Sequence, residues 1–213
     1  MRIIGVDESG KGDFFGPLVV AALVADSEDE PRLQKLGVRD SKKLTDKRIL
    51  EIAADLQRDF VHAVIVIGPE KYNQLYAKIK NLNKLLGWGH ARAIENCLDE
   101  THADLAISDK FGDPKRVTAS MTDKSSELEL RLMVRGESIL QVAAASIIAR
   151  ATFVKQMRRL SEKYGVELPK GAAAHVDTAG RTIVKKYGLE VLPLVAKIHF
   201  KNYQRATMAV SAK

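Results

Sequence analysis

The sequence predicts an α/β protein in which helices flank a mixed five-stranded sheet. Two apolar segments, 2–7 and 17–25, are rich in β-branched residues and close enough in the chain to pair as antiparallel strands. Later strand-like segments are reached through segments with the 3.6-residue period of helices, so the sheet is expected to be mixed. A length of 213 residues is sufficient for one such domain with a full core.

Each element of this fold has its own signal. Short apolar runs predict strands at 2–7, 17–25, 61–67, 104–109 and 128–134. Apolar residues on one face predict helices at 46–59 after a Thr45 N-cap, at 69–79 from Pro69, at 83–100, at 138–163, and two short helices after 176, the last with Pro193. The segments 26–44, 112–126 and 165–176 show no clear period, so we expect loops there. One domain over 1–213 is expected, with about 165–213 as a small C-terminal helical part.

The composition excludes some classes of protein and favours an anionic partner. No apolar run approaches 18 residues and the N-terminus has no signal-peptide pattern, so a membrane-spanning helix is not expected. The single cysteine, Cys97, cannot form an internal disulfide, which fits a buried thiol in a reducing cytoplasm. The formal net charge of +7 favours a polyanion such as nucleic acid. Positive charge is concentrated in two stretches: Lys42, Lys43, Lys47 and Arg48, and Lys155, Arg158, Arg159 and Lys163. Each stretch either contacts a polyanion or is an ordinary solvated surface.

The segment VDESGKGD at 6–13 is the most informative in the chain. Asp7 and Glu8 close an apolar strand, and two glycines with a lysine follow at once. Adjacent residues of a strand point to opposite faces, so both acids are expected to meet one site only if the chain turns at Glu8. Facing carboxylates are costly as anions unless a cation neutralises them, and oxygen ligands suit Mg²⁺ or Mn²⁺. The segment therefore predicts part of a divalent metal site.

Two alternatives apply to the same segment. Gly5 to Lys11 has the G-x-x-x-x-G-K spacing of a phosphate-binding loop, but the next residue is Gly12 instead of Ser or Thr. Such a loop also opens a helix, whereas Phe14-Phe15-Gly16-Pro17 leads into a strand. The second alternative, a polar turn with exposed acids, does not explain why two carboxylates close so apolar a strand.

A two-metal phosphodiester site needs further carboxylates from distant segments. Asp109 ends a short apolar strand as Asp7 does, and Glu137 lies between a strand and the long helix. Asp104, at the start of that strand, and Asp113, further along the loop, compete with Asp109. Taken singly, each acid is more often a helix cap or a surface residue. Their value comes from the set Asp7, Glu8, Asp109 and Glu137.

At this point the sequence resembles bacterial ribonuclease HIII, the type 3 enzyme of the type 2 ribonuclease H family. The matching segments span nearly the whole chain in the expected order, and DESGKGD is the most specific of them. They are VDESGKGDFFGPLV at 6–19, DSKKL at 40–44, GES at 136–138, AAASIIAR at 143–150, LPKGA at 168–172 and KIHFKN at 197–202.

The resemblance implies a ribonuclease H-like fold and an endonuclease that hydrolyses the RNA strand of RNA/DNA hybrids. It implies two Mg²⁺ or Mn²⁺ ions held by Asp7, Glu8, Asp109 and Glu137, and products with 5′-phosphate and 3′-hydroxyl ends. Selectivity for RNA needs contacts to the 2′-hydroxyl, which we assign to the Gly10–Gly12 loop. The residues expected to contact substrate are Ser9, Gly10, Lys11, Gly12, Ser41, Lys42, Lys43 and Ser146. The histidines His62, His90 and His102 are expected to have structural roles.

Three features separate this sequence from its wider family. Gly10-Lys11-Gly12 stands where type 2 enzymes have Gly-Arg-Gly, as is usual for type 3. The segment 170–174 has no tyrosine of the kind that type 2 enzymes use at RNA–DNA junctions, so strict junction specificity is not expected. The N-terminal hybrid-binding domain usual in type 3 is not expected here, because the sequence begins at the first catalytic strand. Two functions stay as alternatives: incision at single ribonucleotides in duplex DNA, and non-catalytic nucleic-acid binding.

Overall fold

In the computed structural model, a five-stranded sheet has the strand order β3-β2-β1-β4-β5. The structure describes residues 1–109, 112–113, 115–125 and 128–208. The strands are β1 (Arg2–Ser9), β2 (Leu18–Asp26), β3 (His62–Ile67), β4 (Leu105–Asp109) and β5 (Glu129–Met133). β1 pairs antiparallel with β2 and parallel with β4, and β4 pairs parallel with β5. The prediction of a mixed five-stranded sheet is therefore confirmed.

The helices follow the sequence signals closely in the first half of the chain. Thr45 caps α2 by accepting the backbone N–H of Arg48, and Pro69 opens α3. The helices are α1 (Glu30–Leu36), α2 (Asp46–Asp59), α3 (Pro69–Ile79), α4 (Leu82–Leu98), α5 (Lys115–Thr118), α6 (Leu140–Tyr164), α7 (Ala174–Tyr187), α8 (Leu192–Val195) and α9 (Lys201–Met208). Three of these were not predicted, since α1 and α5 lie in segments expected to be loops and α9 is an additional C-terminal helix.

The chain divides into two compact units, each made of three chain segments. The first unit comprises 1–9, 19–65 and 81–152, and the second comprises 10–18, 66–80 and 153–213. The expected single domain stays a prediction. None of the helices in these described ranges is long and apolar enough to cross a membrane.

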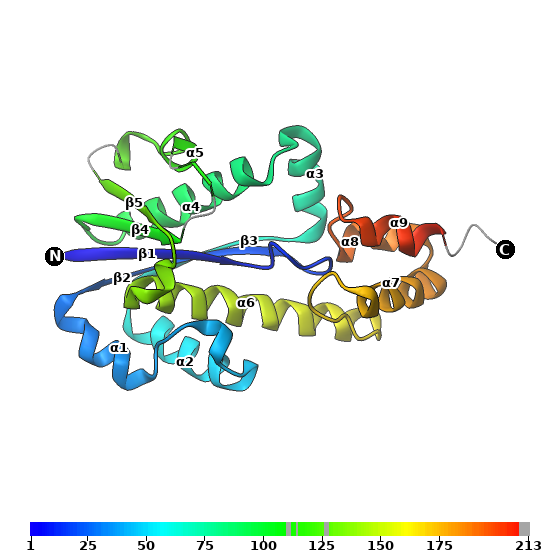
Figure 1. The fold of residues 1–213 in the computed structure, drawn as a ribbon, viewed down its shortest axis with the longest axis horizontal. Helices are drawn as coiled ribbons and strands as arrows, with labels where there is room; N and C mark the ends of the chain where they lie inside the picture. The colour runs from blue at the N-terminus through cyan, green and yellow to red at the C-terminus, as the bar shows by residue number, and fades with distance from the viewer. Residues whose placement is uncertain (110–111, 114, 126–127, 209–213) are drawn as a thin grey trace. The chain divides into compact units, whose positions relative to one another are not determined.

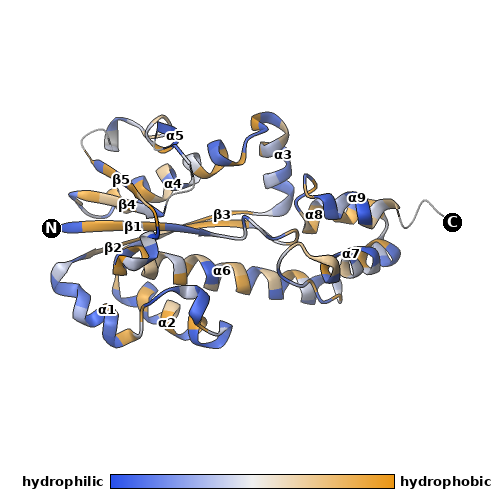
Figure 2. Ribbon diagram, in the orientation of Figure 1, coloured by the Kyte–Doolittle hydropathy of each residue, from blue (hydrophilic) through white to orange (hydrophobic). Residues whose placement is uncertain are grey.

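The first unit buries its core on both faces of the sheet. On one face, Ile4 and Val6 of β1 pack with Ile94 and Cys97 of α4. On the other, Leu105 and Ile107 of β4 pack with Val142 of α6. Figure 1 shows α4 on one side of β1 and the first part of α6 on the other, and Figure 2 shows that the strands between them are mostly hydrophobic. The sheet is thus covered on both faces where β1 and β4 end.

Gly5 allows α6 to approach β1 more closely than any side chain would permit. A Cβ at this position would overlap the backbone of Gln141 and Val142. Asp7 lies two residues beyond Gly5, which is about 6.6 Å along the strand axis. Ser146 lies four residues beyond Val142, which is about 6 Å along the helix axis. The close packing at Gly5 therefore brings Ser146 level with Asp7.

Candidate active site

The two acids of the first motif lie on opposite faces of β1. The strand continues in register with β2 through Ser9, so the predicted turn at Glu8 is wrong. Because side chains alternate along a strand, Asp7 points toward α6 and Glu8 toward α4. Their partners agree with this: Asp7 accepts a hydrogen bond from Ser146, and Glu8 Oε2 lies 3.1 Å from His90 Nε2. The loop-like composition of 8–13 had suggested a turn at Glu8, two residues before Gly10.

Asp109 is the acid that joins Asp7 on the α6 side. The parallel register places Val6 beside Ser108, so the next residues, Asp7 and Asp109, lie side by side on the same face. The Asp109 carboxylate accepts the backbone N–H of Gly136 at 3.0 Å. Neighbouring strand ends thus bring together two acids that are about a hundred positions apart in the sequence.

The competing acids lie elsewhere. Asp104 precedes β4, at its opposite end, where its carboxylate accepts the backbone N–H of Arg2 at 2.7 Å. Asp113 is exposed and accepts the backbone N–H of Lys115 at 3.0 Å, next to the start of α5. Both are exposed acids, as expected of acids taken singly, which leaves Asp109 as the acid of this strand that is near Asp7.

The electrostatics of Asp7 indicate a site where negative charge accumulates. Burial, followed by the charge of Glu8, raises the pKa of Asp7 to about 7, and Asp109 adds to the rise. The hydrogen bonds from Ser146 and from the Glu8 backbone N–H, at 2.8 Å, act in the opposite direction. A divalent cation would relieve the repulsion that these three acids create, so the residues present fit such an ion.

The acids do not form a finished coordination shell. Within the part of the chain that the structure describes, no group of three or more His, Cys, Asp or Glu side chains has the geometry of a metal site. Glu137 lies in a 3₁₀ turn, Gly136–Ser138, and its side chain is partly buried. The turn is tied to Asp109 through Gly136, but Glu137 is not among the charged groups that shift the pKa of Asp7 in the described structure. Asp7 and Asp109 lie side by side, and the charge of Glu8 acts on Asp7 from the other face of β1. Glu137 follows Gly136, whose backbone N–H binds Asp109.

Two predicted substrate-contacting serines lie together behind Asp7. The hydroxyls of Ser41 and Ser146 are 2.9 Å apart, and both residues are buried. Arg150 donates to the carbonyl O of Ser41 at 2.7 Å, which fastens the turn Ser41–Lys43 to α6. In this arrangement Ser146 contacts Asp7 directly and Ser41 supports Ser146. Contact of either hydroxyl with substrate stays a prediction.

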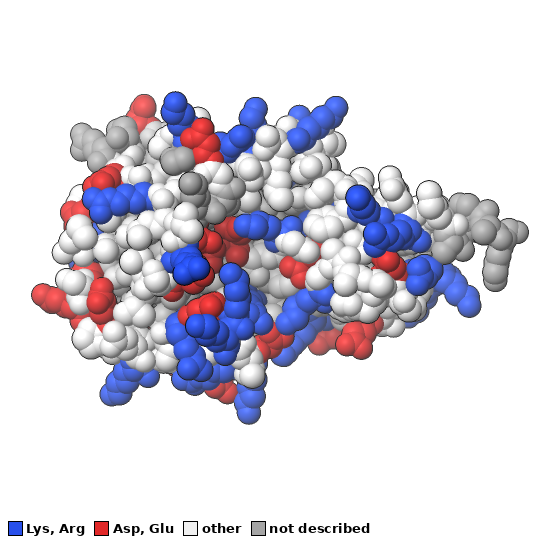
Figure 3. Space-filling model, in the orientation of Figure 1, with Lys and Arg blue, Asp and Glu red and all other residues white. Residues whose placement is uncertain are grey.

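The lysines of the same turn are available to a ligand. Asp40 caps the turn by accepting the backbone N–H of Lys42 at 3.0 Å, and the side chains of Lys42 and Lys43 are exposed. Lys47 and Arg48 follow on the first turn of α2 and are also exposed. Figure 3 shows Lys and Arg side chains gathered over α2 and the turn before it. The first basic cluster predicted from the sequence is therefore a surface cluster.

The glycine-lysine-glycine loop belongs to the second unit. Ser9, partly buried, is the last residue of β1, and Gly10 follows with a φ of 88° that disfavours side chains with a Cβ. Lys11 and Gly12 are exposed. Contact of this loop with a substrate backbone stays a prediction.

A buried lysine anchors the turn that follows this loop. Lys197 Nζ donates to the carbonyl oxygens of Asp13 and Gly16, each at 2.8 Å, although burial lowers its pKa to about 7. Gly171 donates its backbone N–H to the Asp13 carboxylate at 2.6 Å. Sequence reasoning noted the KIHFKN segment without assigning Lys197 a role, because carbonyl acceptors leave no pattern in a sequence.

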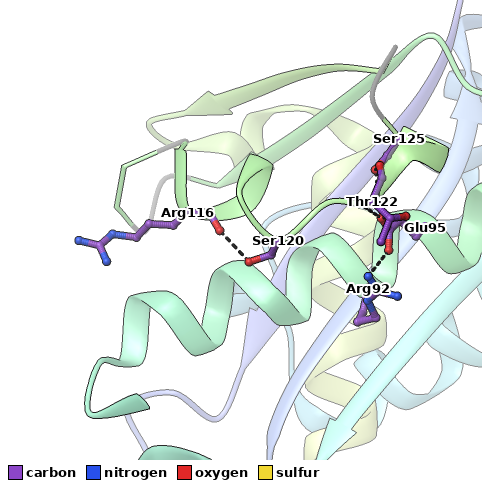
Figure 4. A network of polar contacts seen from close by, with 6 residues as sticks. All are labelled: Arg92, Glu95, Arg116, Ser120, Thr122 and Ser125. Atoms are coloured by element: carbon purple, nitrogen blue, oxygen red, sulfur yellow. Dashed lines mark hydrogen bonds and ion pairs between the residues drawn. The ribbon is translucent and has the colours of Figure 1, made fainter. Parts of the chain in front are cut away.

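A second buried acid fixes the chain after Asp109. Glu95 of α4 accepts hydrogen bonds from the Thr122 hydroxyl at 2.7 Å and the Ser125 hydroxyl at 3.1 Å, and Arg92 lies 2.5 Å from its other oxygen (Figure 4). These contacts attach the connection between β4 and β5 to α4. Sequence reasoning missed Glu95, since its partners are about 30 residues away.

Sequence reasoning also missed the site partner His90. It lies on the buried side of α4, where Leu86, Ile94 and Cys97 are one or two turns away. A histidine spaced by four residues within an otherwise apolar stripe is the signal that would have identified it.

Comparisons with known proteins found related sequences and structures. A family model described as Ribonuclease HII matches residues 4–203. The chain is 44% identical over 203 residues to ribonuclease HIII of Chlamydia abortus, covering 94% of this chain and 68% of that protein. It is 39% identical to ribonuclease HIII of Bacillus licheniformis, covering 100% of this chain and 70% of that protein. A crystal structure of Bst ribonuclease HIII in complex with Mn²⁺ superposes with a TM-score of 0.93 at 34% identity, over 100% of this chain and 71% of that one.

Proposed function

This chain belongs to the ribonuclease HII family and is a ribonuclease H, and from that membership we propose that it cuts the RNA strand of RNA/DNA hybrids by two-metal-ion catalysis. The relatives compared above are ribonucleases HIII. The products would carry 5′-phosphate and 3′-hydroxyl ends. The observation that supports this most directly is the pair Asp7 and Asp109 on neighbouring strands, with burial and the charges of Glu8 and Asp109 raising the pKa of Asp7 to about 7.

Asp7, Glu8, Asp109 and Glu137 are the residues that would hold Mg²⁺ or Mn²⁺. When bound, the two cations supply activation of the attacking water and stabilisation of the charge on the phosphate and the leaving 3′ oxygen. The protein's own contribution is to hold the acids: Gly136 and Ser146 donate to Asp109 and Asp7, respectively. These donors keep the carboxylates oriented without neutralising them.

Other residues would place the hybrid. The exposed Lys11 and Gly12 follow β1 directly, so we assign the 2′-hydroxyl and its adjacent phosphate to the Gly10–Gly12 loop. Lys42 and Lys43 extend from a capped turn, where they would contact phosphates without selecting a base sequence. Cleavage would then depend on the presence of RNA and not on its sequence.

The central test compares two acids of one strand. Asp109→Asn should abolish Mg²⁺- or Mn²⁺-dependent cutting of an RNA/DNA hybrid while hybrid binding persists. Asp104→Asn, at the other end of β4, is the matched control and should cut at the wild-type rate because its carboxylate contacts the Arg2 backbone N–H and His102, away from Asp7. Full-rate cutting by Asp109→Asn would remove Asp109 from the site.

The substrate is tested separately. A hybrid with a long RNA strand should be cut faster than a DNA duplex with one embedded ribonucleotide, and labelled product ends should be 5′-phosphate and 3′-hydroxyl. The reverse preference would support the single-ribonucleotide function. Binding without any metal-dependent cutting would support the non-catalytic alternative.

The lysines are tested by salt dependence. Replacing Lys42 and Lys43 together by alanine should weaken hybrid binding and reduce the slope of log K against log salt by up to about 1.8. An unchanged slope would mean that both side chains face solvent in the complex.

A further inference from the structure

His90 connects two residues that reach it from neighbouring strands. Its ring is fully buried on α4. Nε2 lies 3.1 Å from Glu8 Oε2 of β1, and Nδ1 lies 2.9 Å from the Ser108 hydroxyl of β4. Both ring nitrogens therefore have partners within the α4 side of the sheet.

The chemistry of these partners sets the direction of the hydrogen bonds. An ionised carboxylate only accepts, so Nε2–H donates to Glu8, while the Ser108 hydroxyl meets Nδ1. The Ser108 hydroxyl also lies 3.1 Å from the carbonyl O of Asp109. The His90 imidazole thus connects Glu8 of β1 to Ser108, the residue before Asp109 on β4.

Strand geometry explains why Glu8 needs such a tie. Glu8 leaves β1 on the α4 face, whereas Asp7 and Asp109 leave their strands on the α6 face. The Glu8 side chain is long and only 5% exposed, and its carboxylate must turn toward the end of the sheet to share cations with the other two acids. A fixed donor at Oε2 restricts the orientation of the Glu8 carboxylate, as partners outside the coordination shell of a cation do for its ligands.

We propose that His90 is a positioning residue that holds the Glu8 carboxylate in the orientation required for divalent cation binding. The proposal rests on the proposed function, because it assigns His90 a role toward the cations of that site. A purely structural core histidine would contribute to stability and leave cation affinity unchanged, so the two roles are separable by measurement.

Three substitutions separate the contacts of His90. His90→Leu fills the space and removes both hydrogen bonds, whereas His90→Gln places an amide donor near the position of Nε2. Ser108→Ala removes only the contact to Nδ1. Ile94→Val, at a buried core position on the same helix, is the matched control for packing loss.

The primary readout is Mn²⁺ binding to the intact chain by calorimetry, accompanied by the thermal midpoint without metal and by kcat and KM on a hybrid. We expect His90→Leu to weaken Mn²⁺ binding about 10- to 100-fold and to lower kcat with little change in KM. His90→Gln should recover most of the affinity, and Ser108→Ala should lose about 2- to 10-fold. Ile94→Val should lower the thermal midpoint and bind Mn²⁺ as the wild type does.

Wild-type Mn²⁺ affinity in both His90→Leu and Ser108→Ala would overturn the proposal, as would equal losses in His90→Gln and His90→Leu. If His90→Leu does not fold, the comparison of His90→Gln and Ser108→Ala with Ile94→Val decides. Failure of the wild-type chain itself to bind Mn²⁺ or to cut a hybrid would contradict the proposed function instead, and is therefore a distinguishable result.

Discussion

On the face of β1 that α6 covers, Asp7 meets a hydroxyl and a backbone N–H, whereas on the face that α4 covers, Glu8 meets an imidazole. Ser146 gives Asp7 a hydrogen bond but no compensating charge, and Asp109 stands beside it on the same face. Burial and then the charge of Glu8, with a further contribution from Asp109, raise the pKa of Asp7, so a cation beside Asp7 would be stabilised. The α4 face, with His90 between Glu8 and Ser108, is arranged instead for orientation. The alternation of side chains along β1 thus gives its two neighbouring acids different partners, a hydroxyl for Asp7 and an imidazole for Glu8.

The largest expected effect concerns the fourth acid, which would belong to the α6 face. If Glu137 is a cation ligand, Glu137→Gln should lower kcat by about 100-fold or more, since even residues that only orient a ligand cost 10- to 100-fold. Glu129→Gln, an exposed acid on β5, is the control and should retain the wild-type rate. A steady-state assay on a hybrid measures both. Wild-type activity in Glu137→Gln would restrict the site to the three acids already in electrostatic contact.

The next effect concerns the packing that aligns Ser146 with Asp7. Gly5→Ala inserts a methyl group into the backbone of Gln141 and Val142, so α6 must move away from β1. We expect a loss of about 1–3 kcal/mol in the free energy of unfolding, as for other overpacked sites. Chemical denaturation measures this loss. Gly68→Ala, where a Cβ meets nothing within 4 Å, is the matched control and should change stability much less.

The pH dependence of cation binding sharpens the same contrast. The folded protein raises the pKa of Asp7 from 3.8 to about 7, so between these values it holds a proton that the unfolded chain has lost. Stability of the metal-free protein should therefore fall as pH rises through this window, and the loss should be complete above pH 7. A cation must displace the proton below pH 7, so Mg²⁺ should raise the thermal midpoint more at pH about 8 than at pH about 5.5.

Asp7→Asn is the control for this pH effect. The amide does not titrate, so the difference between the two Mg²⁺-induced shifts should become small. If Mg²⁺ raises the thermal midpoint of the wild type equally at both pH values, the proton and the cation do not compete for Asp7.

The sequence predicted those parts of the molecule that depend on local signals. Thr45 and Pro69 fixed the starts of α2 and α3, and Asp7 and Asp109 were identified because each lies at the end of an apolar strand. The parallel pairing that places the two acids side by side comes from the structure. The prediction failed for α1, because the segment 26–44 that contains it is polar enough to resemble a loop. The helix nevertheless has Pro31 in its first turn and ends at Gly37, which adopts the left-handed conformation.

The missing parts of the site are those created by tertiary contacts. His90 reaches Glu8 across 82 positions, and Ser41 reaches Ser146 across 105, so neither contact leaves a spacing in the sequence. The direction of Glu8 was mispredicted because Ser9 and Gly10 have loop-like composition, while the pairing with β2 extends the strand through Ser9. The pairing of β1 with β2 determines on which face of the sheet the Glu8 side chain lies, and the composition of the segment does not indicate that pairing.

The smallest expected effect concerns the hydroxyl on the α6 face. The Ser146 hydrogen bond lowers the pKa of Asp7 against burial and the two neighbouring acids, so Ser146→Ala should raise that pKa further. The acid limb of the pH–rate profile should then move to higher pH, with a loss of about threefold to tenfold in kcat near pH 7. Ser41→Ala is the matched control: it removes the 2.9 Å contact to Ser146 but leaves Asp7 its donor, so its profile should shift less. Coincident profiles for the wild type and Ser146→Ala would show that the cations, once bound, set the ionisation of Asp7 without help from the hydroxyl.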